Sequence, residues 1–426
     1  MSKTNKAVER VKTALIVLLT ISALLLGWQT GLYHDVANSI PFIGSFADFV
    51  MGSSGAEISS GTQIREAARP MCIVITSKDG GRFGARYDTD ARNAAYDRVI
   101  SIVGETLGSA ARPTEVGEDE WRNALSGPGV YFEYYMPVKL SILDGWIDAR
   151  MPDTTEDALV RRLVVAIGED RSRLYYQDDE SGLFYGADTA SAAGKAQELD
   201  VFSANGAIFA FETGTTGAGN APYVLITGER DFPNLRASAA GSAEELLEIS
   251  VSALGHGHET HTVFQEMDGT RWVGTQFNII VDSFGRVLYR NSDVPRQGEW
   301  QSAPGEGQSI ELARMLVAET IGAVCGDAEV FYDSSEYGAR GSISVYFTYF
   351  AAVGCVVLSD DEYAAKITLV AGVVTEAELN YRNFTFDGEY TRLLPEIQTL
   401  AAAGGEFTLF YSDTGAERIQ PSWGLR

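Results

Sequence analysis

The stretch IELARMLVAETIGAVCG, residues 310–326, decides the fold class of this chain together with the runs that follow it. Apolar side chains recur along it at helical spacing, at Ile310, Leu312, Met315, Leu316, Ile321 and Val324. This spacing predicts an amphipathic helix that packs one face on a neighbouring layer.

Five strand-like runs follow this helix, and short turns separate them. They are AEVFYDS (328–334), SISVYFTYF (342–350), AAVGCVVLS (351–359), AAKITLV (364–370) and GVVTEAELNYRNFTF (372–386). Apolar and polar residues alternate in the last run, which predicts a sheet with one buried face. We therefore expect the 310–326 helix to pack on a sheet of these strands.

The same combination of strands and packed helices extends toward both ends of this half. An amphipathic helix is expected near 241–255 and a shorter one at 393–404. Strands are expected at 260–274, 276–285, 286–292, 406–413 and 417–424.

A second set of elements fills the chain from residue 71 to about residue 228. Two strand-like runs flank Asp79-Gly80-Gly81, which predicts a tight hairpin. Asp88-Thr89-Asp90 supplies capping side chains for a helix that reaches about Leu107. Strands are expected at 129–138, 161–169, 172–177, 182–187, 207–212 and 223–228, and helices at 140–148 and 194–200.

Strands outnumber helices, and no long strand-helix-strand alternation occurs. The predicted class is therefore α+β, with two lobes of antiparallel β-sheet and packed helices. We place the first lobe at 69–238 and the second at 239–426.

An uncharged and mostly apolar run, TALIVLLTISALLLGWQTGLY (13–33), has about the length that a helix needs to cross a bilayer. The tail before it, residues 1–12, carries Lys3, Lys6, Arg10 and Lys12, which places the N-terminus in the cytoplasm and the bulk of the protein outside it. We predict a retained single-pass anchor in the cell membrane rather than a cleaved signal peptide. The Ser/Gly-bearing segment 34–68 then serves as a stalk.

Small residues recur every four positions within this span, at Ala23, Gly27 and Gly31. They share one helix face, and Gly27 to Gly31 forms a G-x-x-x-G motif that lets another helix come close. This face is the predicted contact with a partner's membrane helix.

The chain has 33 Lys and Arg residues against 58 Asp and Glu, a formal net charge of −25. This charge argues against binding to nucleic acid and favours a protein partner. Three cysteines, Cys72, Cys325 and Cys355, are too few for a disulfide framework. The sequence leaves open whether Cys325 and Cys355 pair.

Three of the four histidines, His256, His258 and His261, lie close together in GHGHETH. Imidazole and carboxylate groups suit a transition metal, but the spacing is not that of a zinc helix motif. We predict no metal site and no cofactor, and these histidines are the residues that would bind a metal if one were present. No sequence pattern pairs a Ser or Cys nucleophile with a base, so we predict that the protein is not an enzyme.

The layout resembles the YycH/YycI family. The resemblance rests on the basic tail and single span, on HTVFQEMDGTRWVGTQFNIIVDSFGRVLYRNS, on SVYFTYFAAVGCVVLSDDEYAAKITLVAGVVTEAELNYRNFTF and on LFYSDTGAERIQPSWGLR. It covers roughly residues 260–426 plus the anchor, whereas the first lobe matches only in general order.

This resemblance implies a membrane-anchored, extracytoplasmic regulator of a cell-wall two-component system in Gram-positive bacteria. Such a protein acts in signal transduction by contacting a sensor histidine kinase, directly or through a sister regulator of the same family. Two other hypotheses remain, an extracytoplasmic ligand-binding module of the cell envelope and a metal-dependent envelope hydrolase.

Overall fold

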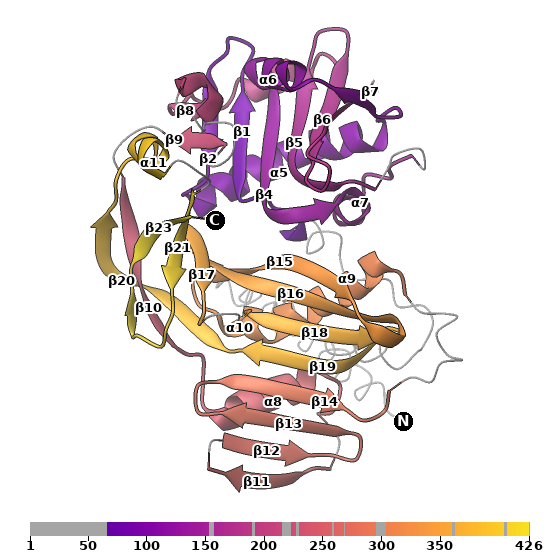
Figure 1. Cartoon of the computed structure of the whole chain (residues 1–426), viewed down its shortest axis with the longest axis vertical. Helices are drawn as coiled ribbons and strands as arrows, with labels where there is room; N and C mark the ends of the chain where they lie inside the picture. Colours follow the sequence, from indigo (N-terminus) through magenta and orange to yellow (C-terminus); the bar gives the residue numbers. More distant parts are fainter. Residues whose placement is uncertain are drawn as a thin grey trace, which may run out of the picture. The chain divides into compact units, whose positions relative to one another are not determined.

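The computed structural model describes residues 66–152, 157–189, 192–214, 223–226, 230–257, 260–267, 269–294, 304–359, 363–403 and 407–425 (Figure 1). All of them belong to one compact unit, Ser59–Arg426. The predicted tail, membrane span and nearly all of the stalk lie outside the described residues. Within the described part, no helix is long and apolar enough to cross a membrane.

A seven-stranded antiparallel sheet, here called the N-terminal sheet, has the order β2-β1-β4-β5-β6-β7-β3. Its strands are β1 (Cys72–Thr76), β2 (Arg82–Ala85), β3 (Thr114–Val116), β4 (Gly129–Lys139), β5 (Leu159–Ile167), β6 (Ser172–Asp178) and β7 (Phe184–Thr189). The predicted hairpin is confirmed, because Thr76 pairs with Arg82 and Gly80 takes a φ of 84°. The predicted meander of β5, β6 and β7 is confirmed as well.

Both faces of the N-terminal sheet are covered. Helix α5 (Thr89–Gly108) lies on one face, where its Tyr96 packs on Phe132 of β4, and the Asp88 carboxylate caps it as predicted. The other face receives α6 (Glu118–Ser126) and the two-stranded ribbon β8 (Ala207–Phe209) and β9 (Val224–Ile226). There Tyr131 of β4 packs on Phe209. Helix α7 (Leu140–Ile147) follows β4 directly.

An eleven-stranded sheet, here called the C-terminal sheet, has the order β11-β12-β13-β14-β19-β18-β16-β17-β21-β23, with β15 paired to β16. Its strands are β11 (Thr262–Glu266), β12 (Gly269–Val273), β13 (Phe277–Asp282), β14 (Arg286–Asn291), β15 (Ala328–Tyr337), β16 (Ser342–Ala351), β17 (Gly354–Val357), β18 (Ala365–Val370), β19 (Val373–Asn380), β21 (Phe407–Ser412) and β23 (Pro421–Leu425).

The prediction of purely antiparallel sheets is wrong for one strand pair, since β17 and β21 run parallel. A parallel pair needs a long crossover, and here β18, β19, β20 (Arg382–Arg392) and α11 (Glu396–Ala403) lie between the two strands along the chain. The alternation of residues within β17 or β21 does not indicate whether the two strands run parallel or antiparallel to each other.

Helices α8 (Ala243–Ala253) and α9 (Glu306–Glu319) contact the C-terminal sheet, as predicted. The expected helix 310–326 is interrupted at Thr320, where ψ is −102°, and continues as the short helix α10 (Ile321–Val324). The Thr320 hydroxyl donates a hydrogen bond of 2.7 Å to the Leu316 carbonyl, the kind of side-chain bond that bends helices.

The sequence pattern missed strand β10 (Asp231–Ala239), which pairs with β20 and with β22 (Arg418–Ile419) in a separate three-stranded sheet. Its Pro233 argues against a strand between two others. The predicted strand 372–386 is in fact β19 and β20, which meet at the fully buried Tyr381 and belong to different sheets.

The C-terminal part of the chain returns to the first half. Leu400 of α11 and Phe407 of β21 pack with Ala210 and Leu225 in one buried cluster. The lobe boundary at 238/239 stays a prediction.

All three cysteines are buried free thiols, so Cys325 and Cys355 are not bridged. Burial raises the pKa of Cys325 to about 11, which keeps this thiol protonated and unreactive at neutral pH.

Candidate functional site

The predicted contact face in the membrane, Ala23, Gly27 and Gly31, lies outside the described residues and stays a prediction. The candidate metal ligands are described in part. His256 shares a hydrogen bond of 2.8 Å between its Nε2 and the Tyr289 hydroxyl, and its ring stacks on Phe277 at 4.3 Å. His261 stacks instead on Trp272, at 4.0 Å.

These contacts give the two histidine rings different neighbours. His258 lies outside the described residues. Among the residues that are described, no three His, Cys, Asp or Glu side chains are grouped as metal ligands would be.

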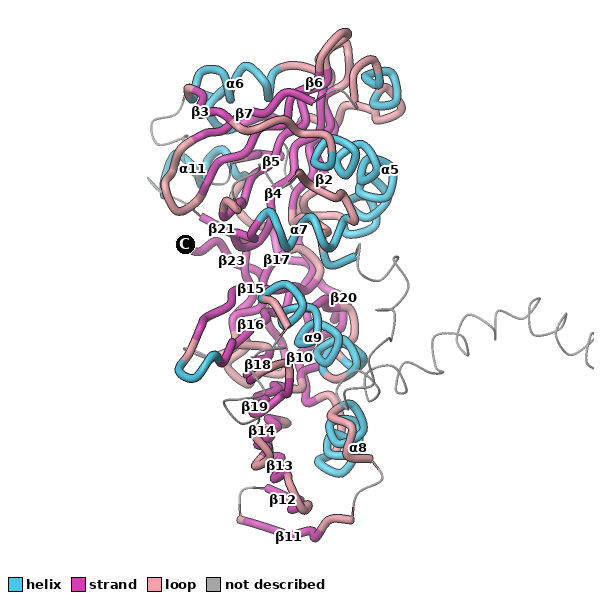
Figure 2. The backbone as a smooth tube through the Cα atoms, turned by 90° about the vertical axis from the view of Figure 1, so that its right-hand side faces the viewer, coloured by secondary structure: helices cyan, strands magenta, loops and turns pink. Residues whose placement is uncertain are grey.

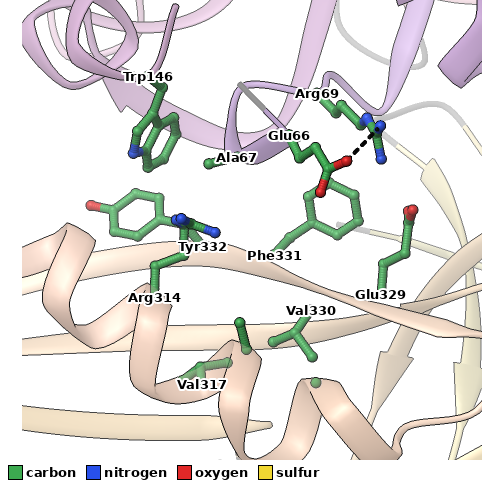
Figure 3. Close-up of a pocket in the computed structure, with 12 residues that line it drawn as sticks. Glu66, Ala67, Arg69, Trp146, Arg314, Val317, Glu329, Val330, Phe331 and Tyr332 are labelled. Atoms are coloured by element: carbon green, nitrogen blue, oxygen red, sulfur yellow. Dashed lines mark hydrogen bonds and ion pairs between the residues drawn. The ribbon is translucent and has the colours of Figure 1, made fainter. Parts of the chain in front are cut away.

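A pocket of about 210 Å³ lies where the two halves of the chain meet (Figure 3). The segment Glu66–Arg69 and Trp146 of α7 form one wall. Arg314 of α9 lines the opposite side with Phe331 and Tyr332 of β15. The sequence places residue 68 at the end of the stalk, and in the structure Ala68 is fully buried within this segment.

Ion pairs hold the charged side chains of this junction pocket. Arg314 makes two hydrogen bonds of 2.6 and 2.8 Å to the Glu311 carboxylate, and Arg69 contacts Glu66 at 3.3 Å. Glu329 pairs at 2.6 Å with Arg92 of α5, whose side chain is 1% exposed.

Burial lowers the pKa of the Arg92 guanidinium, and the Glu329 carboxylate acts in the opposite direction. The Arg92 group also lies over the rings of Phe331 and Phe350, at 5.9 and 5.6 Å. Glu66, Arg69, Arg314 and Glu329, the charged residues that line the pocket, therefore each contact a group of opposite charge.

A second contact between the halves involves Glu396 of α11. Its carboxylate accepts hydrogen bonds from the Tyr87 hydroxyl and the Ile226 N–H, and lies 3.5 Å from the buried Arg86 guanidinium. Burial raises the pKa of Glu396, whereas Arg86 and Tyr87 act to lower it. Sequence reasoning missed this residue, because nothing local distinguishes a single Glu in a short helix.

Within the described residues, the C-terminal sheet has one open face along strands β13, β14, β19 and β18, whereas β16 is buried on both faces. Figure 2 shows α8 and α9 on one side of strands β13 to β19. Residues that face these helices form a buried row, with Ile279, Tyr289 and Ile367 at most 2% exposed. The next row points away from the helices and is formed by Arg271, Ile280, Leu288, Glu378 and Lys366.

This open face combines apolar and charged groups. Leu288 is 38% exposed, and beside it a hollow of about 200 Å³ is lined by Ile280, Arg290, Lys366 and Glu376 among others. Apolar surface with a polar rim is typical of protein interaction sites. The alternation of residue types along these strands in the sequence is a signal that could have located this face, because alternate residues of a strand point to opposite faces of the sheet.

No protein-family model and no curated protein matches this chain. Among solved structures, the chain is similar to the crystal structure of YycH from Bacillus subtilis. The likeness covers 84% of this chain and 94% of that one, with a TM-score of 0.52 and 11% sequence identity. It extends well beyond residues 260–426, where the sequence resemblance was clearest. This chain therefore has a YycH-type fold.

Proposed function

We propose that this protein is a membrane-anchored, non-enzymatic regulator that contacts the sensor histidine kinase of a two-component system controlling cell-wall metabolism. The YycH-type fold over most of the chain is the observation that carries this proposal. The predicted anchor at 13–33 and the family resemblance of the second half agree with it.

Two surfaces of the protein would make the contact. The Ala23, Gly27 and Gly31 face would dock on a membrane helix of the kinase or of a sister regulator. Outside the membrane, the open face around Ile280 and Leu288 is suited to protein binding, because it offers apolar area within a charged surround. Regulation requires that these contacts differ between two states of the kinase, since equal binding to both states shifts nothing.

In-cell crosslinking of the full-length protein, followed by mass spectrometry, tests this proposal. We expect the native protein to capture a sensor kinase or a sister regulator, and a Gly27→Leu, Gly31→Leu double variant to lose that capture. A Ser22→Leu variant, which changes a span position off this face, is the matched control. If the native protein and the double variant both captured only cell-wall enzymes, the proposed contact with a kinase would be wrong.

An extracytoplasmic ligand-binding module is the second candidate, and the junction pocket with its Trp146 and Tyr332 walls is the observation in its favour. Its volume of about 210 Å³ is below the ~300–1,000 Å³ of typical small-molecule sites, which ranks this candidate second. A thermal shift of the full-length protein with a cell-wall fragment, abolished by Trp146→Ala, would favour it over the regulator.

A further inference from the structure

Strand β11 forms an edge of the C-terminal sheet. It pairs with β12 along its whole length, and all five of its residues, Thr262 to Glu266, are exposed. Val263 and Phe264 point to opposite faces and are 48% and 49% exposed. Among the described strands, only β12 lies next to β11 in the sheet.

Natural sheet edges are usually protected against pairing with other chains, by Lys or Pro residues, bulges or covering segments. Strand β11 has none of these residues and pairs with β12 without a bulge. Edge strand β2 of the N-terminal sheet differs. There the Asn205 side chain accepts a hydrogen bond from the Gly84 N–H (2.9 Å) and donates one to the Gly84 carbonyl (2.7 Å).

We propose that β11 pairs with β11 of a second copy of this chain. A two-fold axis requires the two strands to run antiparallel. With the axis at Phe264, each Phe264 lies opposite its equivalent, Val263 lies opposite Gln265, and Thr262 lies opposite Glu266.

This register is self-complementary. Aromatic side chains meet at its centre, and the only charged residue of the strand lies opposite a hydroxyl group rather than another carboxylate. The charge pattern matters because the whole chain carries a net charge of −25, which opposes association through most of its surface. Pairing of the two edges also leaves neither β11 with a free side, so the assembly closes as a dimer. The inference does not depend on the proposed regulatory function.

A pairing of five residues is a small interface, so we expect the dimer to be weak in dilute solution and best detected by trapping. Residues directly opposite in an antiparallel pair have Cα atoms about 4.5–5.5 Å apart, within the range that a disulfide accepts. The native cysteines are at most 3% exposed and would not interfere.

The experiment uses full-length protein in native membranes under mild oxidation. A Phe264→Cys variant is expected to form a disulfide-linked dimer. A Thr262→Cys variant alone should not, because the two copies of residue 262 lie about 14 Å apart along the strands. A mixture of Thr262→Cys and Glu266→Cys protein should crosslink, which fixes the register. Phe284→Cys, at a site that is 77% exposed in the turn between β13 and β14, is the matched control and should stay monomeric.

Three results would overturn the proposal. One is a Phe264→Cys thiol that reacts with maleimide and yet forms no dimer. Another is equal dimer formation by Phe264→Cys and Phe284→Cys, which would show random collision. The third is a disulfide or photocrosslink from position 264 to a different protein only, which would assign the edge to a strand of that protein.

Discussion

The two large sheets of this protein differ in how completely they are covered. In the N-terminal sheet, helix α5 packs on one face and α6 with the β8–β9 ribbon on the other, and strand β1 is buried at every position. In the C-terminal sheet, burial alternates along strand β13, because α8 covers one face of it, whereas strand β16 is buried on both faces. The first sheet is therefore enclosed at β1, whereas the second leaves one face of β13 exposed, and we propose that this face contacts the protein partner.

Ion pairs also differ between regions of the molecule. At the junction of the two halves, Arg86 and Glu396 of α11 are both buried and pair with each other, at 5% and 4% side-chain exposure. On the open face of the C-terminal sheet, Arg290 and Glu376 lie 3.9 Å apart, at 79% and 61% exposure. Geometrically similar ion pairs thus have very different consequences when one partner is removed.

The largest effect expected is for Glu396→Ala. It leaves a buried Arg86 charge and two hydrogen-bond donors without their acceptor, and we expect a loss of about 3–5 kcal/mol in the free energy of unfolding. The matched control Glu376→Ala breaks the exposed pair and should cost less than about 1 kcal/mol. Urea unfolding of both variants is the measurement, and equal losses would contradict the contrast between the buried junction and the open face.

Alanine substitutions at two adjacent residues of one strand test whether both faces of the sheet are covered, because the two side chains point to opposite faces. Ile279→Ala should cost about 2–5 kcal/mol, because its side chain is fully buried under α8, whereas Ile280→Ala on the open face should cost under about 1 kcal/mol. In β1, Val74→Ala and Ile75→Ala should both be clearly destabilising, since both side chains are 1% exposed. Denaturant midpoints of the four variants are the measurement. We expect unequal losses of stability for the two β13 variants and similar losses for the two β1 variants. Equal losses for the two β13 variants would mean that both faces of β13 are covered.

The protected edge of the N-terminal sheet gives a smaller effect. Asn205→Ala removes both hydrogen bonds to Gly84, and at about 0.5–1.5 kcal/mol each we expect a loss of about 1–3 kcal/mol. Asn205→Asp keeps the acceptor for the Gly84 N–H but places a second carboxylate oxygen against the Gly84 carbonyl, so it should not restore the lost stability. Thermal unfolding measures both variants. If Asn205→Ala were neutral, Asn205 would not be what protects the β2 edge.

Glu319 should make stability depend on pH. It ends α9, one of its carboxylate oxygens is buried without a hydrogen-bond partner, and burial raises its pKa from 4.5 to about 7. An acid with a raised pKa in the folded state binds protons more tightly there, so its contribution to stability falls as the pH rises from about 4.5 to about 7. A Glu319→Gln variant should lose this part of the slope. Chemical unfolding between pH 4 and 8 measures it, with the exposed Glu376→Gln as the control.

The sequence predicted those features that depend on local pattern. The spacing from Ile310 to Val324 predicted a helix on a sheet, and Asp79-Gly80-Gly81 predicted a hairpin, and both are present. The alternation in 372–386 predicted one buried face, and β19 has one. The resemblance of the second half predicted a YycH-type fold, which the structural comparison confirms.

Features that depend on distant partners could not be predicted in this way. Strand β10 lacks a strand signal at Pro233 and is held by β20, far along the chain. Glu396 contacts Ile226 and Tyr87, which lie 170 and 309 residues away, so its helix gives no sign of its role. His256 and His261 are close in the sequence, yet their rings contact different aromatic residues, so the sequence alone does not show where each ring lies.

One measurement tests most directly whether the open face of the C-terminal sheet binds the protein partner. A photocrosslinking residue is placed at Leu288 on that face, or at Leu183 beside the N-terminal sheet, two sites that are 38% and 40% exposed. In cells that make the full-length protein, we expect Leu288 to capture a sensor kinase or a sister regulator and Leu183 to capture neither. Capture of that partner from Leu183 alone, or from neither site, would contradict the account.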